Sequence, residues 1–382
     1  MTLNPKAIPL SLYVHWPWCV RKCPYCDFNS HASGMVPEKR YVEALLRELE
    51  REAEGAGDRE IQTIYFGGGT PSLMSAEGFT SLLDGIRARV SVAPDAEISM
   101  EANPGTADEE KFEAYADAGV NRLSLGIQSF DDASLRRLGR IHDRAAAVRA
   151  LEKAVRIFSR VNADLMFGLP FETIERLRDE VVQLVESKTT HVSCYQLTVE
   201  PGTAFAKRIP EGLPDEDLAA DLQEAVVSLL ADAGFVRYEV SGYAKSGEIC
   251  RHNLNYWTFG DYLAIGVGAH GKVTTADGIF RTARFANPER YMRAVEEGVT
   301  PHEEKRRVAD EDLPFEFMLN ALRLTAGVPK RLWTERTDLS DEVIAERVAE
   351  LRKEGLWTTE PERIGTSSRG FAFLSSVQET FL

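Results

Sequence analysis

Three cysteines lie close together near the start of the chain, at Cys19, Cys23 and Cys26. They follow the apolar run Leu10 to Val14, which is typical of a buried strand. A loop of this length can point three thiolates at one centre, and thiolates are the usual ligands of iron-sulfur clusters. A 4Fe-4S cluster held by three cysteines keeps one iron open for another ligand, and we expect the chemistry to begin there.

The residues alone leave other uses of these cysteines open. A zinc ion would need a fourth protein ligand, which His15 or His31 could supply, although the spacing differs from paired Cys-x-x-Cys sites. A disulfide is disfavoured, because Met1 to Pro9 lacks the cationic start and apolar core of a secretory signal. A role as ordinary buried residues of the core would explain one or two of these three cysteines at most. It is the better interpretation of Cys194 and Cys250, which stand alone in the sequence.

Charge and hydropathy narrow the class of protein. The 382-residue chain has a formal net charge of −15, which disfavours nonspecific binding to nucleic acid or to an anionic membrane surface. The sequence has no run of about 18 apolar residues, so we expect no transmembrane segment. The length allows one large domain and a small one. Together with the cysteine pattern, these features are typical of a soluble protein of the reducing cytoplasm.

Strand-like and helix-like segments alternate from Leu10 to about Ala244. The predicted strands are Leu12–His15, Ile61–Phe66, Glu97–Glu101, Arg122–Ile127, Ala163–Phe167 and His191–Leu197. The predicted helices are Pro37–Ala56, Ser75–Val90, Ala107–Ala118, Ala145–Ser159, Thr173–Ser187 and Asp215–Ala233. Repeated strand-helix units specify a parallel sheet with right-handed crossovers, and six units fit a partly open barrel.

Unusual residues stand at the ends of these strands. Gly67 to Pro71 is a Gly-Gly-Gly-Thr-Pro run after the second strand, Glu101 ends the third and Gln128 follows the fourth. In a parallel barrel the working residues gather at the carboxyl ends of the strands. Consecutive glycines let a ligand approach the backbone and leave amides free to bind a carboxylate. Asp164 stands in the apolar run Val161 to Leu169, where an unpaired carboxylate is costly, so we expect it to have a partner.

The Cys-x-x-x-Cys-x-x-Cys loop after a strand resembles the signature of the radical S-adenosylmethionine (SAM) superfamily. The flanking residues Tyr13 to Trp18 and the run Gly67 to Pro71 are similar to the branch that contains the oxygen-independent coproporphyrinogen III oxidases and the HemW haem chaperones. In the oxidases a fourth cysteine stands two residues after the third, whereas this chain has Phe28 there. This departure favours the chaperones and argues against oxidase activity.

The resemblance implies a fold, cofactors and binding residues. The fold is α/β, a partial (β/α)6 barrel, and the cofactors are a 4Fe-4S cluster on the three cysteines and SAM. Gly68, Gly69 and Thr70 would hold the methionine part of SAM or a second SAM molecule. The other cofactor-binding residues that the resemblance implies are Tyr13, Tyr25, Glu101, Gln128, Arg140 and Asp164. Arg140 can pair with a carboxylate in bidentate fashion, and Glu101 can take the ribose hydroxyls or the amino group.

A second motif, His252-Asn253-x-x-Tyr256-Trp257, resembles the HNxxYW sequence that HemW members carry. We predict it on a loop at the barrel mouth, where the histidine could ligate haem iron or flank a planar macrocycle; a structural histidine is the alternative. Gly266 to Gly271 is predicted as a tight turn facing the same pocket, with His270 as a second candidate ligand. The resemblance thus adds haem to the expected ligands.

The sequence pattern changes after the charged stretch Pro301 to Arg307, so we predict two domains, residues 1–300 and 301–382. The second resembles a small winged-helix-like α+β domain, with helices Leu313–Leu324 and Ser340–Glu354 and a β-hairpin through Phe371–Phe373. Acidic residues outnumber basic ones from Glu303 onward, whereas a DNA-reading domain carries a basic face. We expect a lid over the barrel or a docking surface instead.

The hypothesis from the sequence is therefore a haem chaperone of the HemW type, which binds a 4Fe-4S cluster, SAM and haem and passes haem to apo-haemoproteins. The alternative is an enzyme that catalyses the anaerobic oxidative decarboxylation of coproporphyrinogen III to protoporphyrinogen IX. A third interpretation is a zinc-stabilised binding protein without redox chemistry.

Overall fold

The structure, a computed structural model, describes residues 3–105 and 110–382. One large curved sheet runs through it, in the order β14-β13-β12-β11-β1-β4-β5-β6-β7-β8-β10-β9. Its centre is the parallel set β1 (Leu10–Trp16), β4 (Ile61–Gly68), β5 (Val92–Ala102), β6 (Arg122–Gln128), β7 (Arg160–Phe167) and β8 (His191–Gln196). The predicted partial barrel is confirmed, because each of these strands pairs with the next one along the chain.

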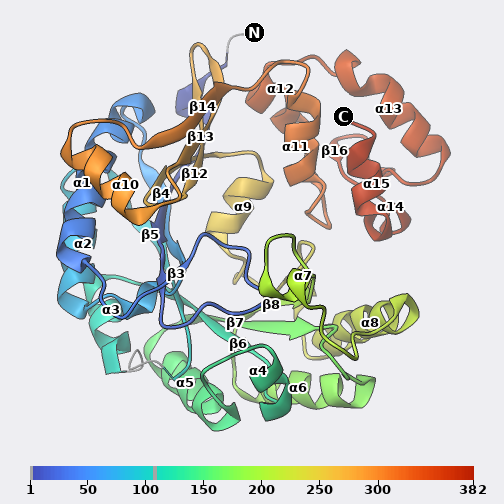
Figure 1. The fold of residues 1–382 in the computed structure, drawn as a ribbon. Helices are drawn as coiled ribbons and strands as arrows, with labels where there is room; N and C mark the ends of the chain where they lie inside the picture. The colour runs from blue at the N-terminus through green and yellow to red at the C-terminus, as the bar shows by residue number, and fades with distance from the viewer. Residues whose placement is uncertain (1–2, 106–109) are drawn as a thin grey trace.

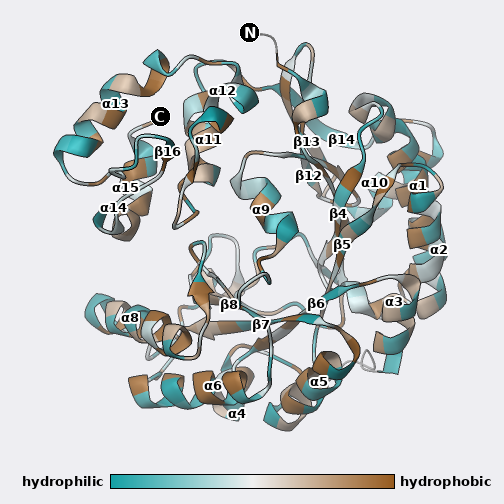
Figure 2. Cartoon of the chain, turned by 180° about the vertical axis from the view of Figure 1, so that it is seen from behind, coloured by the Kyte–Doolittle hydropathy of each residue, from teal (hydrophilic) through white to brown (hydrophobic). Residues whose placement is uncertain are grey.

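Amphipathic helices cover the outer face of this sheet (Figure 1). They are α1 (Glu38–Ala56), α2 (Ala76–Arg87), α3 (Phe112–Ala118), α5 (Arg144–Ile157), α6 (Ile174–Glu186) and α8 (Glu216–Asp232). Both hydrophobic and hydrophilic residues lie around each of them (Figure 2), as expected for helices with one buried stripe. The predicted helix from Ala107 begins outside the described residues. Side chains cap several of these helices at their N-termini, including Ser75, Asp143, Thr173 and Asp215.

The sheet continues past β1, which the sequence did not predict. Strand β11 (Asp261–Ile265) pairs parallel with β1, and β12 (His270–Thr275), β13 (Gly278–Arg284) and β14 (His302–Arg307) follow antiparallel. Buried charges hold this extension to α1: Arg284 Nε donates to Glu48 Oε1 at 2.5 Å. The short elements elsewhere are β2 (Trp18–Cys19), β3 (His31–Ala32), α4 (Asp132–Arg137), α7 (Ala204–Lys207), β9 (Val236–Arg237), β10 (Gly242–Ala244), α9 (Arg251–Trp257) and α10 (Pro288–Glu296).

The C-terminal part is mainly helical. It contains α11 (Leu313–Ala321), β15 (Val328–Pro329), α12 (Arg331–Thr337), α13 (Glu342–Lys353), β16 (Arg363–Ile364), α14 (Ser368–Ala372) and α15 (Leu374–Glu379). The predicted hairpin through Phe371–Phe373 is wrong: Ser367 caps a helix there by accepting from the backbone N–H of Gly370. The small antiparallel pair is β15 with β16 instead. Because β14 pairs with β13, we place the domain boundary after Arg307 rather than after residue 300.

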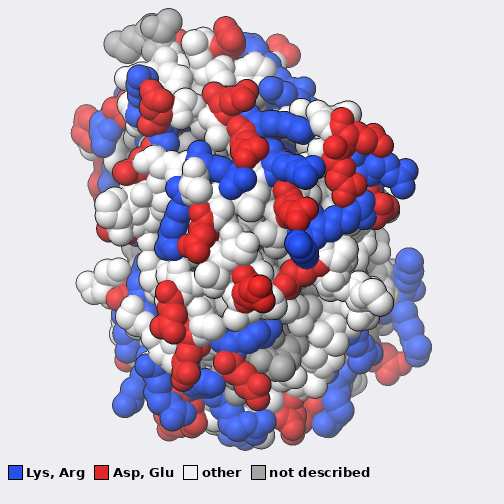
Figure 3. Space-filling model, turned by 90° about the vertical axis from the view of Figure 1, so that its left-hand side faces the viewer, with Lys and Arg blue, Asp and Glu red and all other residues white. Residues whose placement is uncertain are grey.

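The C-terminal domain packs against α9 and the neighbouring chain (Figure 1). Phe317 of α11 contacts Phe259 edge-on with ring centroids 5.4 Å apart, and Arg323 pairs with Glu239 at 3.2 Å. On the face that carries α1, α2 and α10, basic and acidic side chains are interspersed (Figure 3), as where Arg40 pairs with Glu289. Among the described residues, no helix combines the length and the apolar character needed to cross a bilayer.

Candidate functional site: a cysteine loop over a polar barrel cavity

The cysteine loop leaves the carboxyl end of β1 and is closed by a short strand pair. Trp18 of β2 pairs in parallel with His31 of β3, and the backbone N–H of His31 donates to the carbonyl of Pro17 at 2.7 Å. Inside the loop, the N–H of Cys26 donates to the carbonyl of Cys23 at 3.2 Å. These bonds fix both ends of the segment that carries the cysteines.

The glycine run holds the base of this loop. The N–H of Gly69 donates to Trp16 O at 2.6 Å, and the N–H of Thr70 donates to Trp18 O at 2.8 Å. A Cβ at Gly69 would lie only 2.6 Å from Trp18 O, which is too close for any other residue. At Gly68, where φ is +113°, a Cβ would meet the ring of His15 at 2.5 Å. The glycine run therefore has a structural role in holding the cysteine loop, in addition to any role in binding a ligand.

Hydrogen-bond donors surround the three thiols. Thr70 Oγ1 lies 3.6 Å from Cys19 Sγ, and Arg140 Nη1 lies 3.5 Å from Cys23 Sγ. Ser30 Oγ lies 3.9 Å from Cys26 Sγ. Burial raises the pKa of Cys19 and of Cys26, so the protein alone does not favour their thiolates. Iron would displace these protons, and the donors would then stabilise charged sulfur, which fits the chemistry of a cluster.

The zinc alternative finds no support here. In the described part of the chain, no three His, Cys, Asp or Glu side chains are placed to hold a single metal ion. Both histidines proposed as a fourth ligand are engaged elsewhere: His15 Nε2 bonds Asn29 O at 2.9 Å and His31 Nε2 bonds Ala286 O at 3.2 Å. In a four-iron cube each cysteine binds a different iron, so the three sulfurs need not converge on one metal ion.

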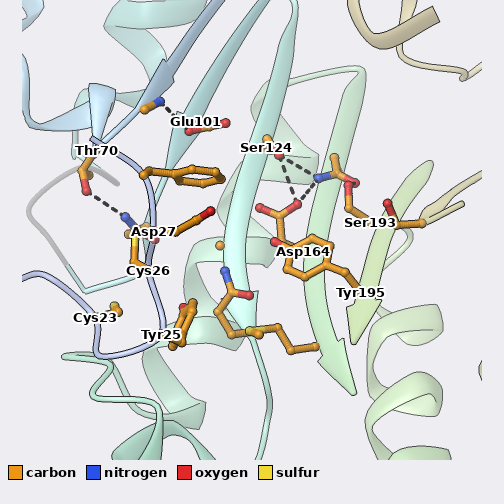
Figure 4. A pocket seen from close by; sticks show the side chains of 18 of the residues that line it. Cys23, Tyr25, Cys26, Asp27, Thr70, Glu101, Ser124, Asp164, Ser193 and Tyr195 are labelled. Carbon is orange, nitrogen blue, oxygen red and sulfur yellow. Dashed lines mark hydrogen bonds between the residues drawn. The ribbon is translucent and has the colours of Figure 1, made fainter. Parts of the chain in front are cut away.

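A cavity of about 540 Å³ opens beneath the loop, within the range of small-molecule sites. It brings together most of the residues expected from the sequence: Cys19, Cys23, Tyr25, Cys26, Gly68, Gly69, Thr70, Glu101, Gln128, Arg140 and Asp164. Figure 4 shows side chains from the cysteine loop and from several strands around it. Tyr13 does not line this cavity. Its hydroxyl lies 3.0 Å from His15 Nδ1, and His15 Nε2 in turn bonds the carbonyl of Asn29 in the cysteine loop, so Tyr13 supports the loop through His15.

Glu101 is held at the level of the glycine run. Its Oε1 accepts from Tyr65 Oη at 2.9 Å, and its Oε2 accepts from the N–H of Gly68 at 3.1 Å. Burial, with the negative charge of Asp164, raises the pKa of Glu101 to about 7. A positively charged ligand would lower it again, so this carboxylate is suited to a cation.

Asp164 has the partners that its burial requires. Its Oδ1 accepts from Asn162 Nδ2 at 2.7 Å and from Ser124 Oγ at 3.5 Å (Figure 4). Burial raises its pKa to about 6 despite these bonds. The expectation that this carboxylate has a partner is thereby confirmed.

Two buried polar atoms near the cysteines have no partner among the described residues. Arg140 Nη2 donates to Gly126 O at 2.8 Å and to Asn103 Oδ1, but its Nε is unsatisfied. The Oε1 of Gln128, a residue with φ of +69°, is also unsatisfied. Leaving buried polar groups unpaired is costly, so a polar ligand in this cavity is indicated. The Arg140 Nε donor and the Gln128 Oε1 acceptor suit the polar groups of SAM. The residues of the cavity therefore fit this cofactor.

The second motif forms a helix, α9, which corrects the prediction of a loop. His252 is buried and points to the barrel wall, where Nδ1 lies 2.7 Å from Thr63 Oγ1 and Nε2 lies 2.6 Å from Tyr256 Oη. Thr63 donates its own proton to Ser11, so Nδ1 carries the imidazole proton and Nε2 accepts from Tyr256. Burial lowers the pKa of His252 to about 3. Neither nitrogen is free for iron in this arrangement.

The motif reaches the cavity through its other members. Asn253 and Trp257 line it, whereas His252 and Tyr256 do not. The predicted turn at Gly266–Gly271 is present, because the N–H of Ala269 donates to the carbonyl of Gly266 at 3.1 Å. Its predicted place is wrong: these residues do not line the cavity, and His270 is an exposed residue at the start of β12.

A set of polar residues on the inward faces of the strands was not predicted from the sequence. They include Tyr65, Asn103, Arg122, Ser124, Asn162, His191, Ser193 and Tyr195. A signal was present, because alternate residues of a strand share a face, and Arg122, Ser124, Gly126 and Gln128 of β6 all line the cavity. This alternation is weak in the sequence, because apolar residues dominate the same strands.

Comparison with known proteins agrees with this geometry. Residues 13–184 match the family model of the radical SAM superfamily, and residues 308–373 match that of the HemN C-terminal domain. A cysteine loop and glycine run at the carboxyl ends of a six-stranded partial barrel, with these matches, define a radical SAM protein.

Full-length relatives place the chain within that class. A protein named heme chaperone HemW from Escherichia coli (strain K12) is 47% identical over 380 residues, covering 99% of both chains. One of the same name from Haemophilus influenzae is 45% identical over 385 residues, again covering 99% of both. The mouse radical S-adenosyl methionine domain-containing protein 1, mitochondrial, is 36% identical and spans 97% of this chain and 87% of its own. The chain belongs to the HemW family.

A solved structure supports the fold. The coproporphyrinogen III oxidase HemN of Escherichia coli superposes with a TM-score of 0.84 over 99% of this chain and 91% of its own. The two sequences are 23% identical, so this likeness shows the shared architecture and not a shared reaction.

Proposed function

We propose that this protein is a haem chaperone that binds a 4Fe-4S cluster, SAM and haem, and delivers haem to apo-haemoproteins. The observation that carries the proposal is that α9 presents Asn253 and Trp257 to the same cavity that the cysteine loop covers. One chamber thus joins the cluster residues to the motif typical of HemW members. The names of the full-length relatives support the same assignment.

The residues divide into two sets of roles. Cys19, Cys23 and Cys26 would hold the cluster, which supplies an open iron and redox chemistry when bound. Glu101, Asp164 and the glycine run would hold SAM beside it. In this protein Tyr65 and the N–H of Gly68 orient Glu101, and Asn162 orients Asp164, so both carboxylates are fixed before the ligand arrives.

Phe28 favours binding a finished macrocycle over decarboxylating its precursor. Its ring is 60% exposed and lines the cavity next to the cysteine loop. An exposed phenyl ring would bury apolar surface by packing against a flat apolar ligand, which favours binding of the macrocycle. Phenylalanine cannot supply the thiol that the oxidases carry at this position. We propose that the C-terminal domain, which meets Trp257 through Arg323, forms part of the surface that apo-haemoproteins contact. The unpaired cysteines suit action in the reducing cytoplasm.

The cofactor half of the proposal can be tested by metal analysis after anaerobic reconstitution. The wild type is expected to hold about four iron and four sulfide per chain. Cys19→Ser, Cys23→Ser and Cys26→Ser should each lose most of both, whereas Cys194→Ser, which changes a buried cysteine outside the loop, should keep them. Stoichiometric zinc without sulfide in the wild type would refute the cluster.

The haem half can be tested by titrating the reconstituted protein with haem and following the Soret band. A saturable complex is expected, with Phe28→Ser weakening it and Phe373→Ser, which changes an exposed phenylalanine of the C-terminal domain, serving as control. The absence of saturable binding would contradict the proposed function.

A further inference from the structure

Arg122 is a buried cation whose guanidinium has no direct hydrogen-bond or ion-pair partner among the described residues. Its side chain is 2% exposed, it is the first residue of β6, and it lines the cavity. Within residues 3–105 and 110–382 its guanidinium makes no hydrogen bond and no ion pair. Glu97, the carboxylate that influences it most, is bonded instead to Arg160 at 2.5 Å and to the N–H of His252 at 3.0 Å. Burial disfavours the charge of Arg122, but the neighbouring Cys250 and Glu97 raise its pKa, so the guanidinium stays charged. Its N–H groups have no acceptor among the described residues, which points to an anionic ligand in the cavity.

The register of the strands places Arg122 deep in the barrel. Arg122 pairs with Ser99 of β5, and two residues further along Ser124 pairs with Glu101. Arg122 therefore lies one inward position below the level of Glu101, and about 20 Å along the strand from Gln128 at the cysteine end. Barrel interiors are usually filled by bulky apolar side chains. Here the cavity continues past the proposed SAM site toward the amino-terminal ends of the strands.

A second unpaired donor faces the same space. Trp257 of α9 lines the cavity, and its buried Nε1 has no acceptor among the described residues. Asn253, one turn earlier on the same helix face, lines the cavity as well. Arg323 lies over the Trp257 ring at 4.3 Å from its centroid and fixes the indole in place. A guanidinium and an indole N–H without acceptors form a site for negatively charged oxygen.

The acidic side chains of this region are already engaged. Glu97 is paired with Arg160, and Glu239 accepts from Ser241 at 3.1 Å and pairs with Arg323 at 3.2 Å. Among the residues that the structure describes, Arg122 is thus the charged group at the deep end of the cavity that lacks a direct partner. A carboxylate matches it best, because its two oxygens fit the planar fork of a guanidinium.

We propose that Arg122, with Trp257 and Asn253, binds a carboxylate of the tetrapyrrole, a propionate of haem. This inference rests on the proposed function and deepens it, because it names the group by which the macrocycle is anchored and the end of the barrel where it is held. The same chemistry could also serve the carboxylate of SAM, and the experiment separates the two.

The test compares haem with its dimethyl ester, in which both propionates are neutral and the macrocycle is unchanged. Both are titrated into the full-length, reconstituted protein in the same mixture of water and dimethyl sulfoxide. The wild type should bind haem about 30-fold or more tightly than the ester, since losing one partner of a buried charge pair costs at least that much. Arg122→Met should bind both alike, with an ester affinity close to that of the wild type.

Further variants separate the anion site from general damage to the protein. Arg122→Lys keeps a charge without the fork and should retain part of the preference. Trp257→Phe keeps an aromatic ring but removes the N–H, and this variant should lose part of the preference for haem over its ester. Arg251→Met removes a partly exposed arginine of α9 that bonds Asp95, and should leave the preference unchanged.

The outcomes are distinct. If the wild type binds haem and its ester equally, this inference is wrong while the proposed function stands; that comparison needs no variant and so does not depend on how Arg122→Met folds. If Arg122→Met weakens SAM binding but leaves the ratio between haem and ester unchanged, the carboxylate belongs to SAM and the inference is again wrong. If the wild type binds neither tetrapyrrole, the proposed function fails and this inference with it.

Discussion

His252 stacks on Tyr65, with ring centroids 5.1 Å apart and planes inclined by 29°. Tyr65 in turn donates to Glu101, whose other oxygen accepts from the N–H of Gly68. The histidine of the HNxxYW motif is therefore connected to the glycine run through one tyrosine and one carboxylate. It supports the wall of the cavity from outside the cavity.

His252→Ala is expected to weaken SAM binding about tenfold, because Tyr65 loses its support and Glu101 its orientation. The Soret spectrum of bound haem should stay like that of the wild type, since the imidazole has no nitrogen free for iron. Equilibrium dialysis and absorption spectra measure the two effects. Unchanged SAM affinity together with the loss of a nitrogen ligand from haem would contradict this role, and Leu254→Ala on the same helix controls for general loosening.

The affinity for SAM should depend on pH through Glu101. Its pKa of about 7 means that the carboxylate is largely protonated at pH 6 and ionised at pH 8. SAM carries a positive sulfonium, so its affinity should rise about tenfold between these pH values. Glu101→Gln should bind SAM weakly and with a flat pH profile, and Glu101→Ala should also bind it weakly. An equally steep profile in Glu101→Gln would assign the dependence to another group.

Glu180 of α6 should destabilise the protein at high pH. Burial raises its pKa to about 8, and although Ser129 donates to one oxygen, the other has no partner among the described residues. The folded state therefore keeps a proton that the unfolded chain releases above pH 4.5, so stability is lost as pH rises toward 8.

Glu180→Gln is accordingly expected to raise the free energy of unfolding by about 1–3 kcal/mol at pH 9 and to change it little at pH 5. Urea unfolding at the two pH values measures this. Glu175→Gln, an exposed change in the first turn of the same helix, should show no such difference. The idea is excluded if Glu180→Gln has the same effect at both pH values.

Gly69→Ala should disturb the cysteine loop. The added methyl would lie 2.6 Å from Trp18 O and 2.9 Å from Trp16 O, and these backbone atoms cannot move without shifting β2 and Cys19. We expect the free energy of unfolding to fall by about 1–3 kcal/mol and the cluster content after reconstitution to be lower. Gly34→Ala, where nothing lies within 4 Å, is the matched control. Full cluster content in Gly69→Ala would show that the loop adapts.

Local patterns predicted much of this protein, and long-range contacts explain what they missed. Strands, helices and the cysteine loop could be predicted because each is encoded within a few neighbouring residues. The role of His252 could not, since Thr63, its partner, is 189 residues away in the chain. The extension from β11 to β14 was missed because β11 pairs with β1 across about 250 residues. The false hairpin arose from the alternation at Phe371–Phe373, which the cap at Ser367 overrides.

The most direct test of the chaperone function is a transfer experiment with a competing substrate. The reconstituted protein, loaded with one equivalent of haem, is mixed anaerobically with apomyoglobin, and the holoprotein formed is followed by its absorption spectrum. A parallel sample receives coproporphyrinogen III, SAM and a reductant, and its porphyrins are separated and quantified. We predict transfer faster than from a passive haem-binding protein at the same concentration, and no protoporphyrinogen IX. Sustained turnover of coproporphyrinogen III, with haem retained or lost no faster than from a passive haem-binding protein, would contradict the account.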